Sequence, residues 1–219
     1  MTQTARFGAG LKKFTGHGIG IDAANVKVRG NQVVFTDSHI APTTGTGIFT
    51  VNDAAILIEG NRVMNWQRGI EVRVAGAATV TGNEVIGNLT GIDARGGNIV
   101  RNVATGNRDG FLLGGAPKVE NNSASKNTGG FGFLVLAGFS GTLTKNNMFS
   151  NARRGISGCG VQNTHVVGLD ATNNYWGSRD GPGFPPADLN CDSTTGPGTG
   201  TTKTAPFATK PFKVKLVKP

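Results

Sequence analysis

The chain has 219 residues, enough for one domain with a sizeable core. Its 35 glycines are about twice the usual share, but Val, Ile, Leu and Phe recur along the whole length, which excludes disorder for most of it. The net charge of +9 favours anionic partners, such as an acidic polysaccharide or an anionic cell surface, although it can also serve solubility alone. No aromatic-rich pattern accompanies the basic residues, so nucleic acid is not an expected partner.

The first fifteen residues are expected to be a lead-in and partial cap. Met1 leads directly into polar residues rather than into an apolar leader. The longest apolar run, 131–139, contains two glycines and is too short to cross a membrane. We therefore expect no membrane span.

From residue 16 to residue 180 one short phrase repeats. It consists of an asparagine, a hydrophobic residue, a second asparagine, and then glycine followed by Ile or Phe. A helical repeat of this length would show a 3.6-residue period and few glycines, and the chain has neither. The glycines that mark the phrase are 19 to 25 residues apart and lie at positions 47, 69, 91, 110, 130 and 155.

Apolar residues alternate after each of these glycines, as in Ile70, Val72 and Val74. A period of two indicates short strands with one buried face. One coil cannot bury its own apolar face, so successive coils must stack. The sequence thus predicts an all-β, right-handed, single-stranded parallel β-helix of about seven coils. Glycine and asparagine are expected at the turns because they tolerate positive φ, and stacked asparagines can bond neighbouring coils.

These phrases resemble the parallel β-helix repeat family within the pectate-lyase-like superfamily, over roughly residues 16–180. The segment 173–183 is similar to the terminal coil of secreted bacterial β-helix proteins, many of them without an assigned activity. The superfamily includes lyases, hydrolases, epimerases, adhesins and phage spikes. The resemblance therefore implies a fold and does not choose a function.

One strand face is the candidate site. Glu71 and Asp93 lie two positions after the glycines at 69 and 91. Arg73 and Arg95 lie four positions after these glycines, and Asp22 lies four positions after the glycine at 18 on an earlier coil. Glu71 should stack on Asp93, and two such carboxylates raise each other's pKa unless a cation lies between them. All five residues are ligand-binding candidates.

The chemistry of this face has two interpretations. Glu71 and Asp93 could form a calcium site, and with Arg73 and Arg95 a catalytic set; no other cofactor is expected. The resemblance implies for this version a lyase or epimerase in which calcium acidifies the C5 proton of an acidic sugar and an arginine abstracts it. The alternative is a structural lattice of salt bridges between coils.

The Pro-, Gly- and Thr-rich segment 181–219 is expected to be an extended tail packed on the solenoid. If Ile156 points inward, alternation places Cys159 outward on the same strand, where a disulfide with Cys191 would clip the tail onto the last coils. Such a bond indicates an oxidising compartment, hence an extracellular or cell-surface protein, whereas two unpaired thiols would suit a cytosolic one.

The tail has a predicted docking place. Leu112, Leu134 and Leu136 should form an outward apolar patch, part of which residues 206–216 would cover. Trp176 is expected to cap the open end of the core.

The leading functional hypothesis is a secreted, non-catalytic module, structural or binding an anionic polysaccharide or cell-surface partner. The alternatives are the calcium-dependent lyase or epimerase and a subunit that stacks end to end into a filament or surface fibre.

Overall fold

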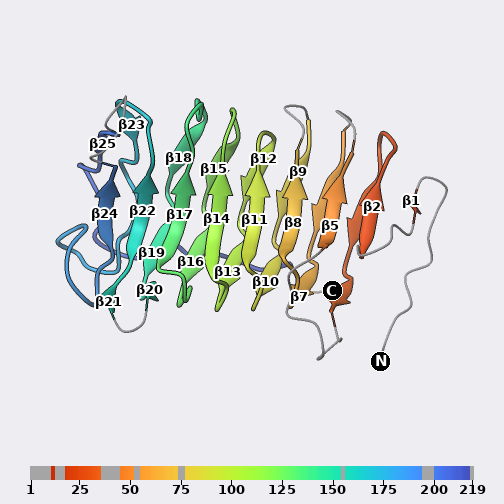
Figure 1. The fold of residues 1–219 in the computed structure, drawn as a ribbon, viewed down its shortest axis with the longest axis horizontal. Coiled ribbons are helices and arrows are strands. Elements are labelled where there is room, and N and C mark those ends of the chain that lie inside the picture. Colours follow the sequence, from red (N-terminus) through yellow and green to blue (C-terminus); the bar gives the residue numbers. More distant parts are fainter. Residues whose placement is uncertain are drawn as a thin grey trace.

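The structure is a computed structural model that describes residues 11–12, 18–35, 45–51, 55–73, 77–153, 156–193 and 200–217. These residues contain strands and no helix, and the strands stack coil upon coil along one axis (Figure 1). The predicted all-β parallel solenoid is confirmed. The lead-in before residue 11 lies outside the described residues.

Sheet A is the longest sheet, with nine strands. Its first strand is antiparallel to the second, and the remaining strands are parallel. In spatial order its strands are β1 (Leu11–Lys12), β2 (Ile19–Ile21), β5 (Thr46–Thr50), β8 (Arg68–Val72), β11 (Thr90–Ala94), β14 (Asp109–Leu113), β17 (Phe131–Val135), β22 (Cys159–Asn163) and β24 (Leu189–Asp192).

Two six-stranded parallel sheets complete each coil. Sheet B contains β3 (Lys27–Arg29), β6 (Leu57–Glu59), β9 (Thr79–Thr81), β12 (Asn98–Val100), β15 (Lys118–Glu120) and β18 (Thr142–Thr144). Sheet C contains β4 (Gln32–Val34), β7 (Arg62–Met64), β10 (Glu84–Ile86), β13 (Val103–Thr105), β16 (Ser123–Ser125) and β19 (Asn147–Phe149). Two short pairs lie near the C-terminal end: β20 (Ala152–Arg153) with β21 (Ile156–Ser157), and β23 (Leu169–Asp170) with β25 (Thr202–Lys203).

The corner between sheets B and C has the same two-residue form from coil to coil. Its first residue has positive φ, and its second is an asparagine. The positive φ falls on Gly30, Gly60, Gly82, Arg101, Asn121, Lys145 and Asn173. The prediction that the turns need residues at positive φ is therefore confirmed, but the repeated asparagine is the residue after the one that adopts it.

The repeated asparagine forms a ladder along this corner. Oδ1 of Asn122 accepts the backbone N–H and the side-chain amide of Asn102 at 2.9 and 3.0 Å. The Asn122 amide in turn donates to Asn146 Oδ1 at 3.0 Å. This ladder 1 comprises Asn31, Asn61, Asn83, Asn102, Asn122, Asn146 and Asn174. Because all of these side chains except that of Asn31 are buried, each coil supplies the polar partners that its neighbour needs.

A second ladder follows the corner between sheets C and A. It contains Asn88, Asn107, Asn127 and Asn151, and its last member is Asp188. The two ladders fix the register of two of the three corners, which satisfies buried backbone groups that lie outside the strands.

The core consists of inward side chains stacked in columns. One column on sheet A runs through Ile48, Ile70, Ile92, Phe111 and Phe133. The rings of Phe111 and Phe133 stack with centroids 4.6 Å apart. At the C-terminal end Trp176 is fully buried beside Gly160, so the prediction that it packs on the end of the core is confirmed.

Glycines also form a column, because each lies against the next coil's backbone. A Cβ on Gly91 would lie 2.5 Å from the carbonyl oxygen of Gly110, and a Cβ on Gly110 equally close to that of Gly132.

We predict that Gly110→Ala lowers the free energy of unfolding by about 2 kcal/mol, since the backbone must move to admit the methyl group. Gly183→Ala is the control, because nothing lies within 4 Å of a Cβ there. Urea denaturation of both variants checks this; equal midpoints would contradict it.

Two sequence assignments in this column were wrong. The glycines in register are Gly132 and Gly160, not those at positions 130 and 155, because the corner after β16 is longer and the β20–β21 pair is inserted before β22. Phe131 consequently pairs with Asp109 rather than with Phe111. Ile156 lies in β21 and Cys159 in β22, so the alternation argument that linked them fails. Val74 lies outside the described residues.

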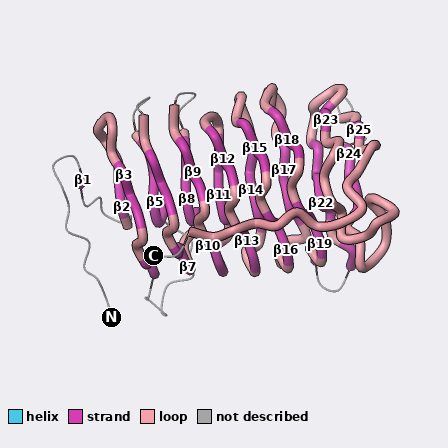
Figure 2. The backbone as a smooth tube through the Cα atoms, turned by 180° about the vertical axis from the view of Figure 1, so that it is seen from behind, coloured by secondary structure: helices cyan, strands magenta, loops and turns pink. Residues whose placement is uncertain are grey.

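The C-terminal segment packs on the solenoid, as predicted, but in another place. Residues 206–217, here called the strap, run back along the B–C corner on the far side from sheet A (Figures 1 and 2). Phe212 exchanges two hydrogen bonds with the Asn147 side chain, at 2.8 and 2.9 Å, and Val217 N–H reaches Gly82 O. The prediction that 206–216 cover Leu112, Leu134 and Leu136 is wrong, because the corner offers hydrogen-bond partners that a leucine patch lacks. Leu112 and Leu134 do lie in register on sheet A.

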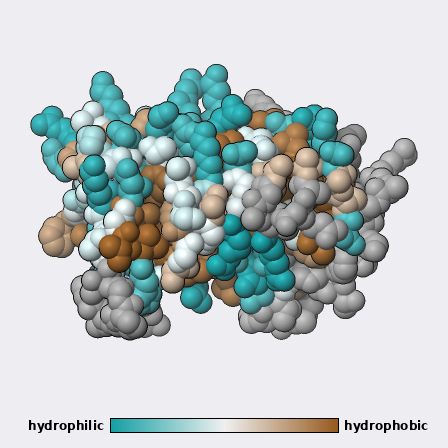
Figure 3. Space-filling model, turned by 90° about the horizontal axis from the view of Figure 1, so that it is seen from above, coloured by the Kyte–Doolittle hydropathy of each residue, from teal (hydrophilic) through white to brown (hydrophobic). Residues whose placement is uncertain are grey.

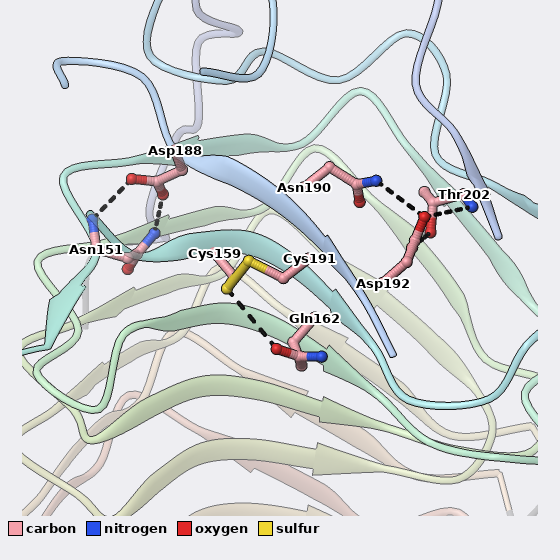
Figure 4. The surroundings of a disulfide bond; sticks show 8 residues. All are labelled: Asn151, Cys159, Gln162, Asp188, Asn190, Cys191, Asp192 and Thr202. Atoms are coloured by element: carbon pink, nitrogen blue, oxygen red, sulfur yellow. Dashed lines mark hydrogen bonds between the residues drawn. A yellow bond between two sulfur atoms is a disulfide. The ribbon is translucent and has the colours of Figure 1, made fainter. Parts of the chain in front are cut away.

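The predicted disulfide is present. Cys159 and Cys191 lie on the neighbouring strands β22 and β24, with Cα atoms 5.7 Å apart (Figure 4). The bond holds the last strand of sheet A on the solenoid.

We expect Cys159→Ser with Cys191→Ser to lower the free energy of unfolding by about 3 kcal/mol, because the unfolded chain gains the entropy of a loop of 32 residues. Thermal unfolding of wild type with and without reductant, beside the double variant, checks this; a variant as stable as the oxidised protein would contradict it.

Candidate functional site

The predicted carboxylates lie together on the outward face of sheet A. Asp93 on β11 is the register partner of Glu71 on β8. The same column continues to Phe49 on one side and Leu112 on the other, so the acidic stretch is two coils long. The predicted stacking of Glu71 on Asp93 is confirmed.

Both carboxylates are buried beneath arginine side chains. The exposed fractions of Glu71 and Asp93 are 5% and 3%. Arg73 Nε lies 2.7 Å from Glu71 Oε1, and Arg95 Nε lies 3.2 Å from Asp93 Oδ1. A third guanidinium, that of Arg68, lies 3.1 Å from Asp93 Oδ2 and 3.8 Å from Glu71 Oε1, so it bridges the two acids.

This arrangement shifts the pKa values of two groups. Burial raises the pKa of Asp93, and the guanidinium groups of Arg95 and Arg68 oppose that shift. The hydrogen bond and the negative charge of Glu71 raise the pKa of Arg73. The arginines thus offset only part of the effect of burial on Asp93, although their distances to the two carboxylates are those of ion pairs.

A calcium ion does not fit this arrangement. Calcium takes six to eight oxygen ligands, commonly several from carboxylates. Here Glu71 Oε1 is engaged by Arg73 and its Oε2 accepts the Thr46 hydroxyl at 3.0 Å. Within the described ranges, no three His, Cys, Asp or Glu side chains lie close enough to hold a metal ion.

Asp22 is not brought to the pair. It follows β2, while Glu71 is on β8, and β5 lies between these strands. Val51, the residue after β5, is 44% exposed and separates Asp22 from the arginine positions. Of the five residues predicted for this site, the structure brings Glu71, Arg73, Asp93 and Arg95 together.

A small hollow of about 140 Å³ adjoins the arginine cluster. Its lining includes Arg68, Thr90, Arg108 and Asp109. Asp109 is 6% exposed, its Oδ2 lies 3.4 Å from Arg108 Nε, and its Oδ1 has no hydrogen-bond partner. Burial raises the pKa of Asp109, and Arg108 opposes that shift. The hollow thus offers a buried acceptor beside two guanidinium groups.

Sequence reasoning missed Arg68, Arg108 and Asp109. The available signal was the position before each marker glycine, which is Arg68, Thr90 and Asp109 in three successive coils. These three residues lie in register with one another on sheet A. Strict alternation from the inward Ile70 would point Arg68 inward, so it does not predict that Arg68 reaches Glu71 and Asp93 on the outer face.

The side on which the sheet A strands end is mixed. Seen from above, it shows hydrophilic residues together with near-neutral ones and a compact hydrophobic patch (Figure 3).

The chain is a member of a known family. Residues 11–177 match the model of the right handed beta helix region, and the chain therefore belongs to this family. The match agrees with the parallel order of the three large sheets and makes the solenoid right-handed. No curated protein and no solved structure matches the chain. None of the described residues form a helix long and apolar enough to cross a membrane.

Proposed function

We propose that the chain is a secreted, non-catalytic β-helix module that binds an anionic polysaccharide through the arginine-covered face of sheet A. The observation that carries the proposal is the state of this face: buried carboxylates under partly exposed guanidinium groups. The side chains of Arg68, Arg73 and Arg95 are 34%, 66% and 40% exposed, and their ion pairs are made by Nε. A guanidinium has five N–H donors, so its outer edge can still receive a carboxylate or sulfate.

The same geometry speaks against a lyase. Such an enzyme needs a base that accepts a carbon-bound proton. Glu71 raises the pKa of Arg73, which makes that guanidinium a poorer base. The carboxylates are ion-paired beneath the arginines and cannot reach a sugar from there. Secretion is supported by the disulfide, since such bonds persist in oxidising compartments.

Binding to immobilised polygalacturonate and alginate, measured at several salt concentrations, tests this function. We expect Arg73→Ala with Arg95→Ala to weaken binding about tenfold at low salt, because two exposed cations leave the face. Arg29→Ala with Arg62→Ala is a matched control, since it removes the same charge from ion pairs on sheets B and C. Salt-insensitive retention, or equal losses in both variants, would contradict the proposal; release of an unsaturated product would favour the lyase.

Self-association is a second candidate, favoured by the ends of sheets B and C. Strands β3 and β4 are edge strands in the described part of the chain. An unpaired strand edge can take up a strand from another molecule. Sedimentation and electron microscopy at rising concentration would test this, and single particles throughout would exclude it.

A further inference from the structure

A second concentration of positive charge lies on the opposite side of the solenoid from the arginine face. The strap carries three exposed lysines. Two cations, Arg101 and Lys145, occupy the B–C corner along which the strap runs, and Lys118 lies beside them on β15. The strap lysines are Lys210, Lys213 and Lys215.

Acidic residues nearby do not neutralise the strap. Glu120 is engaged by Lys118 at 3.0 Å and by Lys145 at 2.9 Å. The other two acids of sheets B and C are also paired with cations of those sheets: Glu59 with Arg29, and Glu84 with Arg62. The strap lysines therefore add positive charge to a surface whose acids already have partners.

The strap holds its lysines in a fixed row. Phe212 and Val214 are partly buried, while Lys213 and Lys215 are exposed, which is the alternation of an extended chain. Their spacing is about 6.6 Å at the rise of an extended strand. The two Phe212–Asn147 hydrogen bonds and the Val217–Gly82 bond fix the row on the solenoid. A pre-formed row loses little conformational freedom when it binds.

The corner beneath the strap carries its cations at a conformational cost. The equivalent position is glycine or asparagine in the other coils, but Arg101 and Lys145 have φ of 57° and 55°. A long L side chain is disfavoured in this left-handed region, where glycine is not. The two bulky residues that occupy it are both cationic. Such strain points to a role of the side chains beyond the fold.

We propose that the strap and the corner beneath it form a linear binding site for a polyanion, separate from the arginine face. The site consists of Lys210, Lys213, Lys215, Arg101, Lys145 and Lys118. Five of these six cations are lysines, which act as point charges without the bidentate geometry of arginine, so the site recognises charge density rather than one sugar stereochemistry. Its ligand is a chain of repeated carboxylate, sulfate or phosphate groups.

The decisive experiment compares two triple variants of equal net charge. The strap variant is Lys210→Ala, Lys213→Ala and Lys215→Ala, and the control is Lys27→Ala, Arg179→Ala and Lys203→Ala. Affinity for polygalacturonate, heparin and polyphosphate is measured at several salt concentrations. We expect the strap variant to bind at least about tenfold more weakly at low salt and the control to change less than twofold. The polymer with the largest loss identifies the anionic group. An unchanged strap variant, or an equal loss in the control, would overturn the proposal.

A corner variant, Arg101→Gly with Lys145→Gly, separates binding from folding. We expect its melting temperature to stay equal or rise, because glycine is unstrained there, while affinity falls. Full affinity would overturn the role of the corner. The two proposals can also be told apart. A loss of affinity only in the Arg73/Arg95 variant would overturn the strap site and leave the proposed function intact. A loss of affinity only in the strap variant would overturn the proposed function and leave the strap site intact.

Discussion

Asn122→Ala is expected to lower the free energy of unfolding by about 4 kcal/mol. The side chain is fully buried, accepts two hydrogen bonds from Asn102, and donates to Asn146 and to the Ile99 carbonyl oxygen, the last at 2.8 Å. Alanine leaves the buried Asn102 N–H without its acceptor and removes the bonds that the amide donates to Ile99 and Asn146. Urea denaturation followed by circular dichroism measures the loss.

The adjacent residue provides a matched control. Asn121 occupies the positive-φ position with φ of 56° and is not a member of ladder 1. Because glycine tolerates that conformation, Asn121→Gly should leave stability within about 0.5 kcal/mol of wild type. Similar losses in the two variants would show that the ladder does not carry the effect.

The second large effect concerns Asp188, the last member of the second ladder. It is 1% exposed, and it accepts the Asn151 N–H at 3.0 Å and the Asn151 side-chain amide (Figure 4). Burial raises the pKa of Asp188 to about 7, and its hydrogen bonds only partly oppose that shift. An asparagine at this rung would carry no charge.

The sign of the pH effect follows from the raised pKa. Below about pH 4 the carboxyl is protonated in the folded and unfolded chains alike. Between pH 4 and 7 the folded chain keeps a proton that the unfolded chain has released, so stability falls as the pH rises. The contribution lost by pH 8 is up to about 4 kcal/mol.

Asp188→Asn should remove this contribution. We expect the free energy of unfolding of the variant to equal that of wild type near pH 4. At pH 8 it should be higher by up to about 4 kcal/mol, because the amide stays neutral. Guanidinium denaturation of both proteins at pH 4, 6 and 8 measures the difference. A difference that does not change with pH would contradict the assignment of the shift to this carboxyl.

The fold could be predicted because the solenoid repeats its local chemistry. The marker glycines and the apolar residues that follow them recur at coil length, and neither a helix nor an antiparallel sandwich reproduces that pattern. Register was predicted where the corner between sheets C and A keeps three residues, as before β8, β11 and β14, and failed where that corner lengthens before β17. The glycine at 130 resembled a marker only because the longer corner places it two residues before Gly132.

The candidate site could be predicted only in part. The stacking of Glu71 on Asp93 follows from period-two alternation. The bridging role of Arg68 does not, because it depends on the rotamer of a long side chain that crosses from one coil to the next. The path of the strap was also hidden, since it depends on single partners such as Asn147 and Phe212 rather than on a periodic pattern.

The length of the strap limits how many coils can lie between the two points at which it is attached. Its fixed points, Asn147 and Gly82, belong to coils whose ladder 1 members are Asn146 and Asn83, three steps apart and thus about 14 Å at strand spacing. The five links from Phe212 to Val217 reach about 16–18 Å when fully extended. One coil duplicated between these two points would stretch that gap to about 19 Å, beyond their reach. The strap would then have to release one of them, so it limits the number of coils in this part of the solenoid.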